Sequence, residues 1–136
     1  MITQKKACFL FVSTPFSGIE AFVRNIQAAL NERSGDIESH WLFIEWSPKE
    51  WVASLPLVSG NWTLKGGLVA RSRIRSLEGS GKRFDVVFLN SIVPLYLLGS
   101  FAKRVPVVLS LDTTPHLLEQ YSQWYHVRGS NVLAAF

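Results

Sequence analysis

Three short groups of polar residues follow apolar runs of the sequence, and they are the first candidates for chemistry. These groups are Ser17-Gly18-Ile19-Glu20, Asn90-Ser91 and Asp112-Thr113-Thr114-Pro115. Each stands just before a segment with a helical pattern, where free backbone N–H groups and the helix dipole favour an anion such as phosphate. If the fold brings the three groups together, they predict a single ligand site.

The first group has two interpretations. In the first interpretation the group is a ligand-binding loop, in which Gly18 lets the backbone approach a phosphate closely and Glu20 stabilises the loop. As a capping box, Ser17 and Glu20 satisfy the free N–H groups at the start of a helix. The glycine fingerprints of dinucleotide-binding and P-loop proteins are absent from the chain, which counts against a dehydrogenase or an NTPase.

Asp112 ends an apolar run, where an acid is costly to bury unless it is hydrogen-bonded or functional. It is our candidate catalytic residue, either accepting a hydrogen bond from a sugar hydroxyl or supporting a cationic transition state. Thr113 and Thr114 beside it are candidate substrate contacts. An equally good explanation is that Asp112 accepts hydrogen bonds from the helix that follows. Asn90 and Ser91 are likewise either ligand contacts or a helix N-cap.

Basic residues gather in one part of the sequence and offer a surface for anions. The six are Lys65, Arg71, Arg73, Arg75, Lys82 and Arg83. Arg71 and Arg75 are one helical turn apart and share a face, which could lie on anionic lipid with a gain of about 1 kcal/mol per basic residue. The alternative is a solvated helix face. Aromatic residues are not interleaved with these charges, so we do not expect nucleic-acid binding here.

Composition restricts the class of protein further. The 136 residues carry 14 Lys and Arg against 10 Asp and Glu, a net charge of +4, and 48% are apolar, which suits one folded domain over 1–136. One cysteine and three widely spaced histidines exclude an internal disulfide and give no metal-ligand spacing, so we expect no metal. The uncharged stretch 86–102 contains Pro94 and Gly99 and fits a buried strand and helix better than a membrane span. We expect a cytoplasmic chain, at the inner face of the membrane if the arginines bind lipid.

The elements that would position these groups alternate along the chain. Apolar runs predict strands at 7–13, 40–46, 84–90 and 105–111, and helical spacing predicts helices at 17–30, 64–79, 92–103 and 114–125. Apolar strands separated by helices are typical of a parallel sheet covered on both faces. We therefore expect a doubly wound, Rossmann-like α/β domain, whose ligands bind beyond the carboxyl ends of the strands.

The order of these segments resembles the N-terminal, acceptor-side domain of family 4 glycosyltransferases, which have the GT-B fold. Ser17-Gly18-Ile19-Glu20 is similar to the family's Gly-Gly-x-Glu loop, with Ser17 in place of the first glycine. The stretch FDVVFLNS at 84–91 resembles its D-V-V-H-x-H strand, with Phe88 and Asn90 at the histidine positions. Asp112 falls where many members carry an acceptor-side histidine, within a D-x-T-P form found in some subgroups.

The resemblance implies a three-layer α/β/α half of an enzyme that moves a sugar from a nucleotide-diphosphate sugar to a glycan or lipid acceptor, usually with retention. It implies no metal or other cofactor. In this family a second Rossmann-like domain with an E-x7-E motif binds the nucleotide, so we expect residues 1–136 to be inactive without that partner domain. Two other classes stay open: a non-catalytic α/β binding or scaffold module, and a basic nucleic-acid-associated domain.

Overall fold

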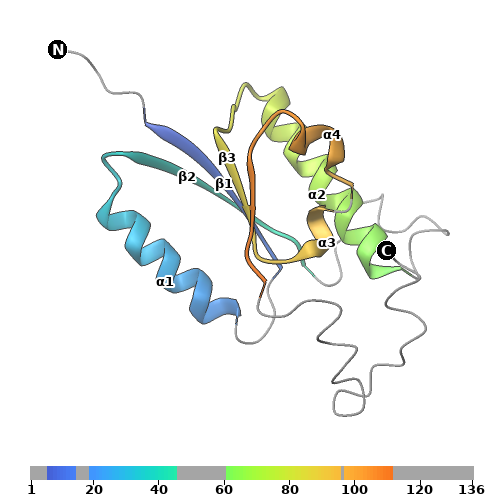
Figure 1. The fold of residues 1–136 in the computed structure, drawn as a ribbon, viewed down its shortest axis with the longest axis horizontal. Helices are drawn as coiled ribbons and strands as arrows, with labels where there is room; N and C mark the ends of the chain where they lie inside the picture. Colours follow the sequence, from blue (N-terminus) through green and yellow to red (C-terminus); the bar gives the residue numbers. More distant parts are fainter. Residues whose placement is uncertain (1–5, 15–18, 46–60, 96, 112–136) are drawn as a thin grey trace, which may run out of the picture.

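A computed structural model describes residues 6–14, 19–45, 61–95 and 97–111 and shows a four-stranded, all-parallel sheet with helices between the strands (Figure 1). The strands are β1 (Ala7–Ser13), β2 (Ile37–Phe43), β3 (Val86–Leu89) and β4 (Val107–Leu109), in the spatial order β2-β1-β3-β4. The helices are α1 (Ile19–Glu32), α2 (Trp62–Gly79), α3 (Ile92–Leu95) and α4 (Gly99–Ala102). This arrangement confirms the predicted α/β class and is compatible with a Rossmann-like fold.

The elements lie where the sequence predicts them to within a few residues, and two differences from the expected ranges are informative. β2 begins at Ile37 rather than at residue 40, because β1 pairs along its whole length, from Ala7 opposite Ile37 to Ser13 opposite Phe43. The single helix expected at 92–103 is wrong, since α3 ends at Leu95 and α4 begins at Gly99. A continuous helix would place Gly99 in its interior, where glycine is a weak helix former, so a break before Gly99 costs little. The helix expected at 114–125 lies outside the described residues.

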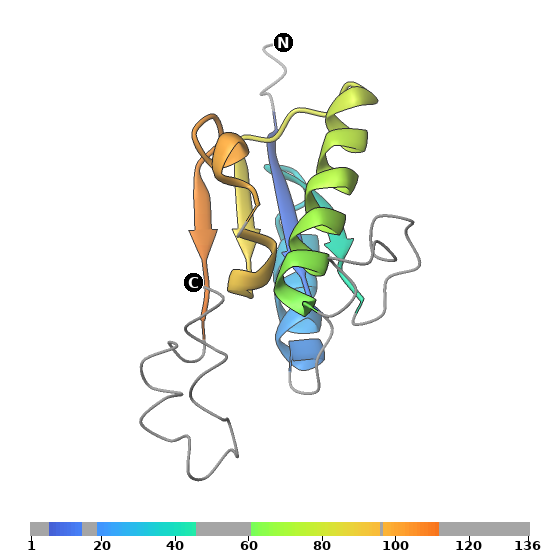
Figure 2. The ribbon, with the colours of Figure 1, turned by 90° about the vertical axis from the view of Figure 1, so that its right-hand side faces the viewer.

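The main core lies between one face of the sheet and α2. Alternate side chains of a strand point to opposite faces, so Leu10 and Val12 lie on one face of β1 while Phe11 lies on the other. The fully buried apolar side chains that fill this core include Leu10, Val12, Ile44, Val69, Ala70, Ile74, Val87, Leu89 and Leu98. Figures 1 and 2 show α2 and α4 on this face of the sheet and α1 on the opposite face.

The face toward α1 is lined by aromatic rings. Phe11 stacks on Trp41 with a centroid distance of 4.4 Å, and Phe88 lies 5.5 Å from Phe11 and 6.3 Å from Phe22 of α1. Phe22 and Phe43 nevertheless keep 40% and 39% of their surface exposed. α1 therefore covers this face only in part with the residues described.

Two adjacent glycines allow α2 to approach α3 and the residues after it. A Cβ atom on Gly66 would lie 2.7 Å from Cγ1 of Val93, and one on Gly67 would lie 3.3 Å from Cγ of Leu97. Asn61 caps the start of α2, because its Oδ1 accepts a 3.0 Å hydrogen bond from the backbone N–H of Leu64. Across the four described ranges, no helix is both long and apolar enough to cross a membrane.

Candidate functional site

The carboxyl ends of the two central strands are joined by one side chain. Asn90, directly after β3, donates a 2.7 Å hydrogen bond from Nδ2 to Oγ of Ser13, the last residue of β1. The backbone N–H of Thr14 donates to Oδ1 of Asn90 over 3.3 Å. An asparagine amide carries two N–H donors, so as far as the described residues go, Asn90 keeps a second N–H that can donate a hydrogen bond to a ligand oxygen.

A pocket of about 220 Å³ opens beside this link, between the ends of β1 and β2 and the first turns of α1. It is lined by Ser13, Ile19, Glu20, Val23, Arg24 and Phe43. Pockets that enclose a whole small molecule usually measure about 300–1,000 Å³, so this one suits a single ring or one end of a larger ligand. The lining offers a carboxylate, a guanidinium and a hydroxyl beside apolar surface, a combination suited to a ligand with several hydroxyl groups.

Thr14 adds a polar group at the same edge. It is fully buried, and its Oγ1 has no hydrogen-bond partner among the described residues. A buried hydroxyl without a partner costs about 1–3 kcal/mol. Such a cost at the carboxyl end of a central parallel strand fits a position where a ligand group or a neighbouring segment completes the hydrogen bonding.

The structure places three of the predicted site residues at this edge. Glu20 lines the pocket, and Asn90 contacts its lining residue Ser13. Ser91 accepts a 3.3 Å hydrogen bond at Oγ from the backbone N–H of Val93, which supports the helix-cap interpretation of that residue. The remaining predicted contacts, Ser17, Gly18, Asp112, Thr113 and Thr114, lie outside the described residues, so their place at this edge stays a prediction.

The predicted membrane-facing pair lies on α2. Arg75 is exposed and Arg71 is half-buried, and neither makes a hydrogen bond or ion pair within the described part of the chain. Arg73, which the sequence did not mark as a site residue, behaves differently. Its Nη1 donates a 2.6 Å hydrogen bond to the carbonyl oxygen of Phe43, at the end of β2 beside the pocket.

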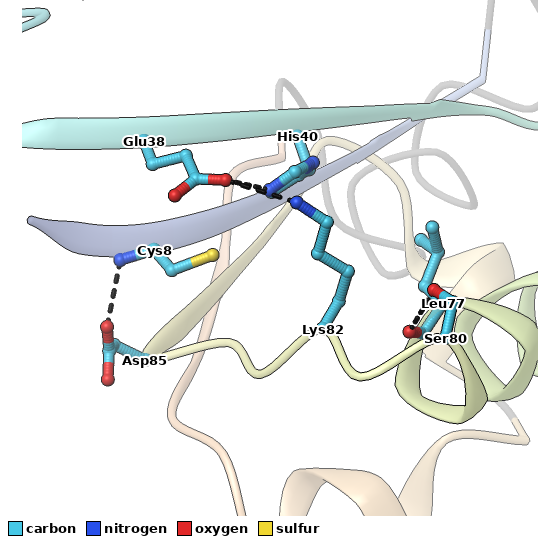
Figure 3. Close-up of polar contacts among 7 residues, drawn as sticks. All are labelled: Cys8, Glu38, His40, Leu77, Ser80, Lys82 and Asp85. Atoms are coloured by element: carbon cyan, nitrogen blue, oxygen red, sulfur yellow. Dashed lines mark hydrogen bonds and ion pairs between the residues drawn. The ribbon is translucent and has the colours of Figure 1, made fainter.

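A second polar cluster lies near the opposite, amino edge of the sheet (Figure 3). Cys8 of β1 pairs with Glu38 of β2, and His40 follows two residues later on the same face. The Sγ, carboxylate and ring-nitrogen atoms of these three residues all lie within 4.8 Å of one another. No metal-ligand spacing is visible along the chain here, because the parallel register brings together Cys8 and Glu38, which are 30 positions apart.

Hydrogen bonds organise this cluster. Oε1 of Glu38 lies 2.8 Å from Nε2 of His40 and 3.3 Å from Nζ of Lys82. The hydrogen bonds from His40 and Lys82, together with the positive charge of Lys82, lower the pKa of Glu38 below its ordinary value. The backbone N–H of Cys8 donates to Oδ2 of Asp85 over 2.8 Å, which fixes the start of β1 against the loop after α2.

Comparisons of the chain with protein-family models, curated proteins and solved structures gave no match. Inferences about function therefore rest on two groups of residues: those around the pocket at the carboxyl edge of the sheet, and Cys8, Glu38 and His40 near its amino edge.

Proposed function

We propose that this chain is the acceptor-binding domain of a glycosyltransferase that moves a sugar from a nucleotide-diphosphate sugar to a glycan or lipid acceptor. One observation carries the proposal: the pocket beside Ser13 and Glu20 opens at the carboxyl edge of an all-parallel sheet. Ligands of open α/β sheets bind at this edge. The proposal includes a three-layer GT-B arrangement, in which a second domain would bind the nucleotide.

The pocket chemistry fits an acceptor with neighbouring hydroxyl groups. The Glu20 carboxylate would accept hydrogen bonds from sugar hydroxyls, and the Arg24 guanidinium would donate to hydroxyl or anionic oxygens. Phe43 and Val23 provide apolar surface for the C–H side of a sugar ring. Asn90 would hold Ser13 in position at the rim.

The resemblance described above supplies the rest of the proposed machinery. Asp112 would act as the catalytic residue, with Thr113 and Thr114 as acceptor contacts. Ser17 and Gly18 would place backbone N–H groups near the donor phosphate. The donor itself would be held mainly by the second domain, so this chain alone would bind acceptor without turning it over.

An NMR titration of the whole 136-residue chain tests the proposal. The probes are a panel of neutral oligosaccharides, a short-chain glycolipid and a nucleotide-diphosphate sugar, each added to ¹⁵N-labelled protein. We expect saturable shifts at Ser13, Glu20 and Arg24 with at least one acceptor, and weaker ones with the nucleotide sugar. A single-stranded oligonucleotide serves as the probe for the nucleic-acid alternative.

Matched variants decide whether the shifts report binding in the pocket. Glu20→Gln should weaken acceptor binding by about 10-fold, since it removes one charge-assisted hydrogen bond of roughly 1.5–3 kcal/mol. Asn25→Ala, an exposed change on α1 away from the pocket lining, should leave the affinity unchanged. Shifts that avoid the pocket for every sugar, or tighter binding of the oligonucleotide, would contradict the proposal and favour a different kind of module.

A further inference from the structure

We propose that Cys8, Glu38 and His40 form a binding site for a divalent metal ion of the zinc type, at the opposite edge of the sheet from the pocket. The site does not depend on the glycosyltransferase proposal, because it shares no residue with the pocket. Figure 3 shows the three side chains on neighbouring strands, with Cys8 directed toward the space between them and Lys82.

The geometry requires only small movements of side chains. The three candidate ligand atoms lie within 4.8 Å of one another. In a tetrahedral zinc site with bonds of about 2.0–2.3 Å, neighbouring donor atoms are roughly 3.3–3.8 Å apart. A change of about 1 Å is within reach of side-chain rotation, because Glu38 is exposed and Cys8 and His40 are half-buried. The paired strands hold the three backbones in place.

The donor set matches the chemistry of zinc. Thiolate sulfur, imidazole nitrogen and carboxylate oxygen are its three ordinary protein ligands, and three of them leave one position for water. The thiolate and the carboxylate together balance the charge of the ion, while His40 binds as a neutral ring. Binding replaces the S–H bond of Cys8 by a sulfur–metal bond and releases the thiol proton to solvent.

The surrounding residues would support such a site. Asp85 accepts the hydrogen bond of the Cys8 backbone N–H, and the His40 ring lies edge-on to Phe84 at a centroid distance of 5.8 Å. Lys82 now supplies the positive charge beside Glu38, at 3.3 Å. A metal ion would take over that charge, so Lys82 competes with the metal for Glu38.

A cobalt titration of the full, reduced chain tests the site, because four-coordinate Co²⁺ reports on its ligands through its absorption spectrum. We expect one equivalent of Co²⁺ to produce intense visible bands and a thiolate-to-cobalt charge-transfer band, both removed by Zn²⁺. The chain contains one cysteine, so the charge-transfer band can arise only from Cys8. A chain that gives no such bands would overturn the proposal.

Four variants test the site: two change the proposed ligands Cys8 and Glu38, one is a control, and one changes Lys82. Cys8→Ser should abolish the charge-transfer band, and Glu38→Gln should weaken cobalt binding at least about 10-fold, whereas the control Glu32→Gln on α1 should not change it. Lys82→Gln should tighten binding several-fold, because it removes the competing charge without removing a ligand. Bands that survive Cys8→Ser, equal effects of the two glutamate changes, or weaker binding by Lys82→Gln would each contradict the site. Circular dichroism of each variant should match that of the parent chain, which separates loss of a ligand from loss of the fold.

Discussion

Asn90 fastens β3 to β1, because its Nδ2 donates to Oγ of Ser13 over 2.7 Å while its Oδ1 accepts the N–H of Thr14 over 3.3 Å. Ser13 in turn lines the pocket at the start of α1. Asn90 therefore positions a residue of the pocket without lining the pocket itself. We expect a change at Asn90 to affect both the stability of the fold and the binding of a ligand in the pocket.

Replacing Asn90 by alanine should destabilise the fold by about 1–3 kcal/mol. The change leaves the Thr14 N–H, which lies beside a fully buried side chain, without its acceptor. Urea unfolding followed by circular dichroism measures the loss. Asn25→Ala on the exposed side of α1 is the control and should stay within about 0.5 kcal/mol of the parent chain. A loss equal to that of the control would mean that the link is not formed in solution.

Gly66→Ala should separate α2 from α3. The added methyl group would lie 2.7 Å from Cγ1 of Val93, and such overpacking costs about 1–3 kcal/mol against a gain of up to about 1 kcal/mol in helix propensity. We expect a net loss of stability in thermal unfolding. Gly79→Ala is the matched control, because nothing lies within 4 Å of its Cβ position, and it should be neutral or slightly stabilising. If both variants gain stability, the close approach of α2 and α3 is wrong.

The acid limb of the stability curve should depend on Glu38. Its pKa is lowered in the folded protein from the ordinary value of 4.5, so its contribution is present above about pH 4.5 and is lost as the pH falls through the folded pKa. Glu38→Gln should therefore lower the free energy of unfolding at neutral pH and flatten its decline below pH 4.5. Urea titrations at a series of pH values measure this. The control Glu32→Gln removes a carboxylate without removing the contacts to His40 and Lys82, and a parallel flattening in that variant would contradict the assignment.

The double variant Arg71→Ala/Arg75→Ala should bind anionic vesicles more weakly if α2 lies against lipid. Each basic residue near a charged surface contributes about 1 kcal/mol, so the partition coefficient should fall by roughly 10- to 30-fold. Sedimentation with vesicles containing phosphatidylserine gives the measurement, and raised salt should abolish the difference. Lys103→Ala, an exposed change after α4, is the charge control. Equal binding by the parent chain and the double variant would show that this helix face is merely solvated.

Local sequence patterns were sufficient to predict that the four strands exist, but not where every strand and helix begins and ends. The continuous apolar run at 7–13 predicted β1 to the residue, because such a run is typical of a central strand in a parallel sheet. The start of β2 at Ile37 was missed because Glu38 and Ser39 are polar, and pairing with β1 makes them part of a strand. The break between α3 and α4 was missed, because Pro94 is tolerated in the first turn of a helix and the apolar content of 92–103 favoured one helix.

Some residues of the candidate sites could be predicted from the sequence, and others depend on the three-dimensional arrangement. Glu20 and Asn90 were predicted to lie at one edge by the rule that parallel strands place their carboxyl ends together, and both contact or line the same pocket edge. The proximity of Cys8 to His40 depends on strand register, which spacing along one chain does not reveal. The hydrogen bond from Arg73 to Phe43 depends on how α2 lies across the sheet, which the sequence pattern does not predict.

β1 carries Cys8 near its start and Ser13 at its end, so one extended strand spans from the proposed metal site to the pocket. At about 3.3 Å per residue the two positions are roughly 17 Å apart. A paramagnetic ion held at Cys8 would broaden the resonances of a sugar in the pocket to a degree set by that separation. The broadening would then report the distance between the ion and the bound acceptor, without any chemical label on either molecule.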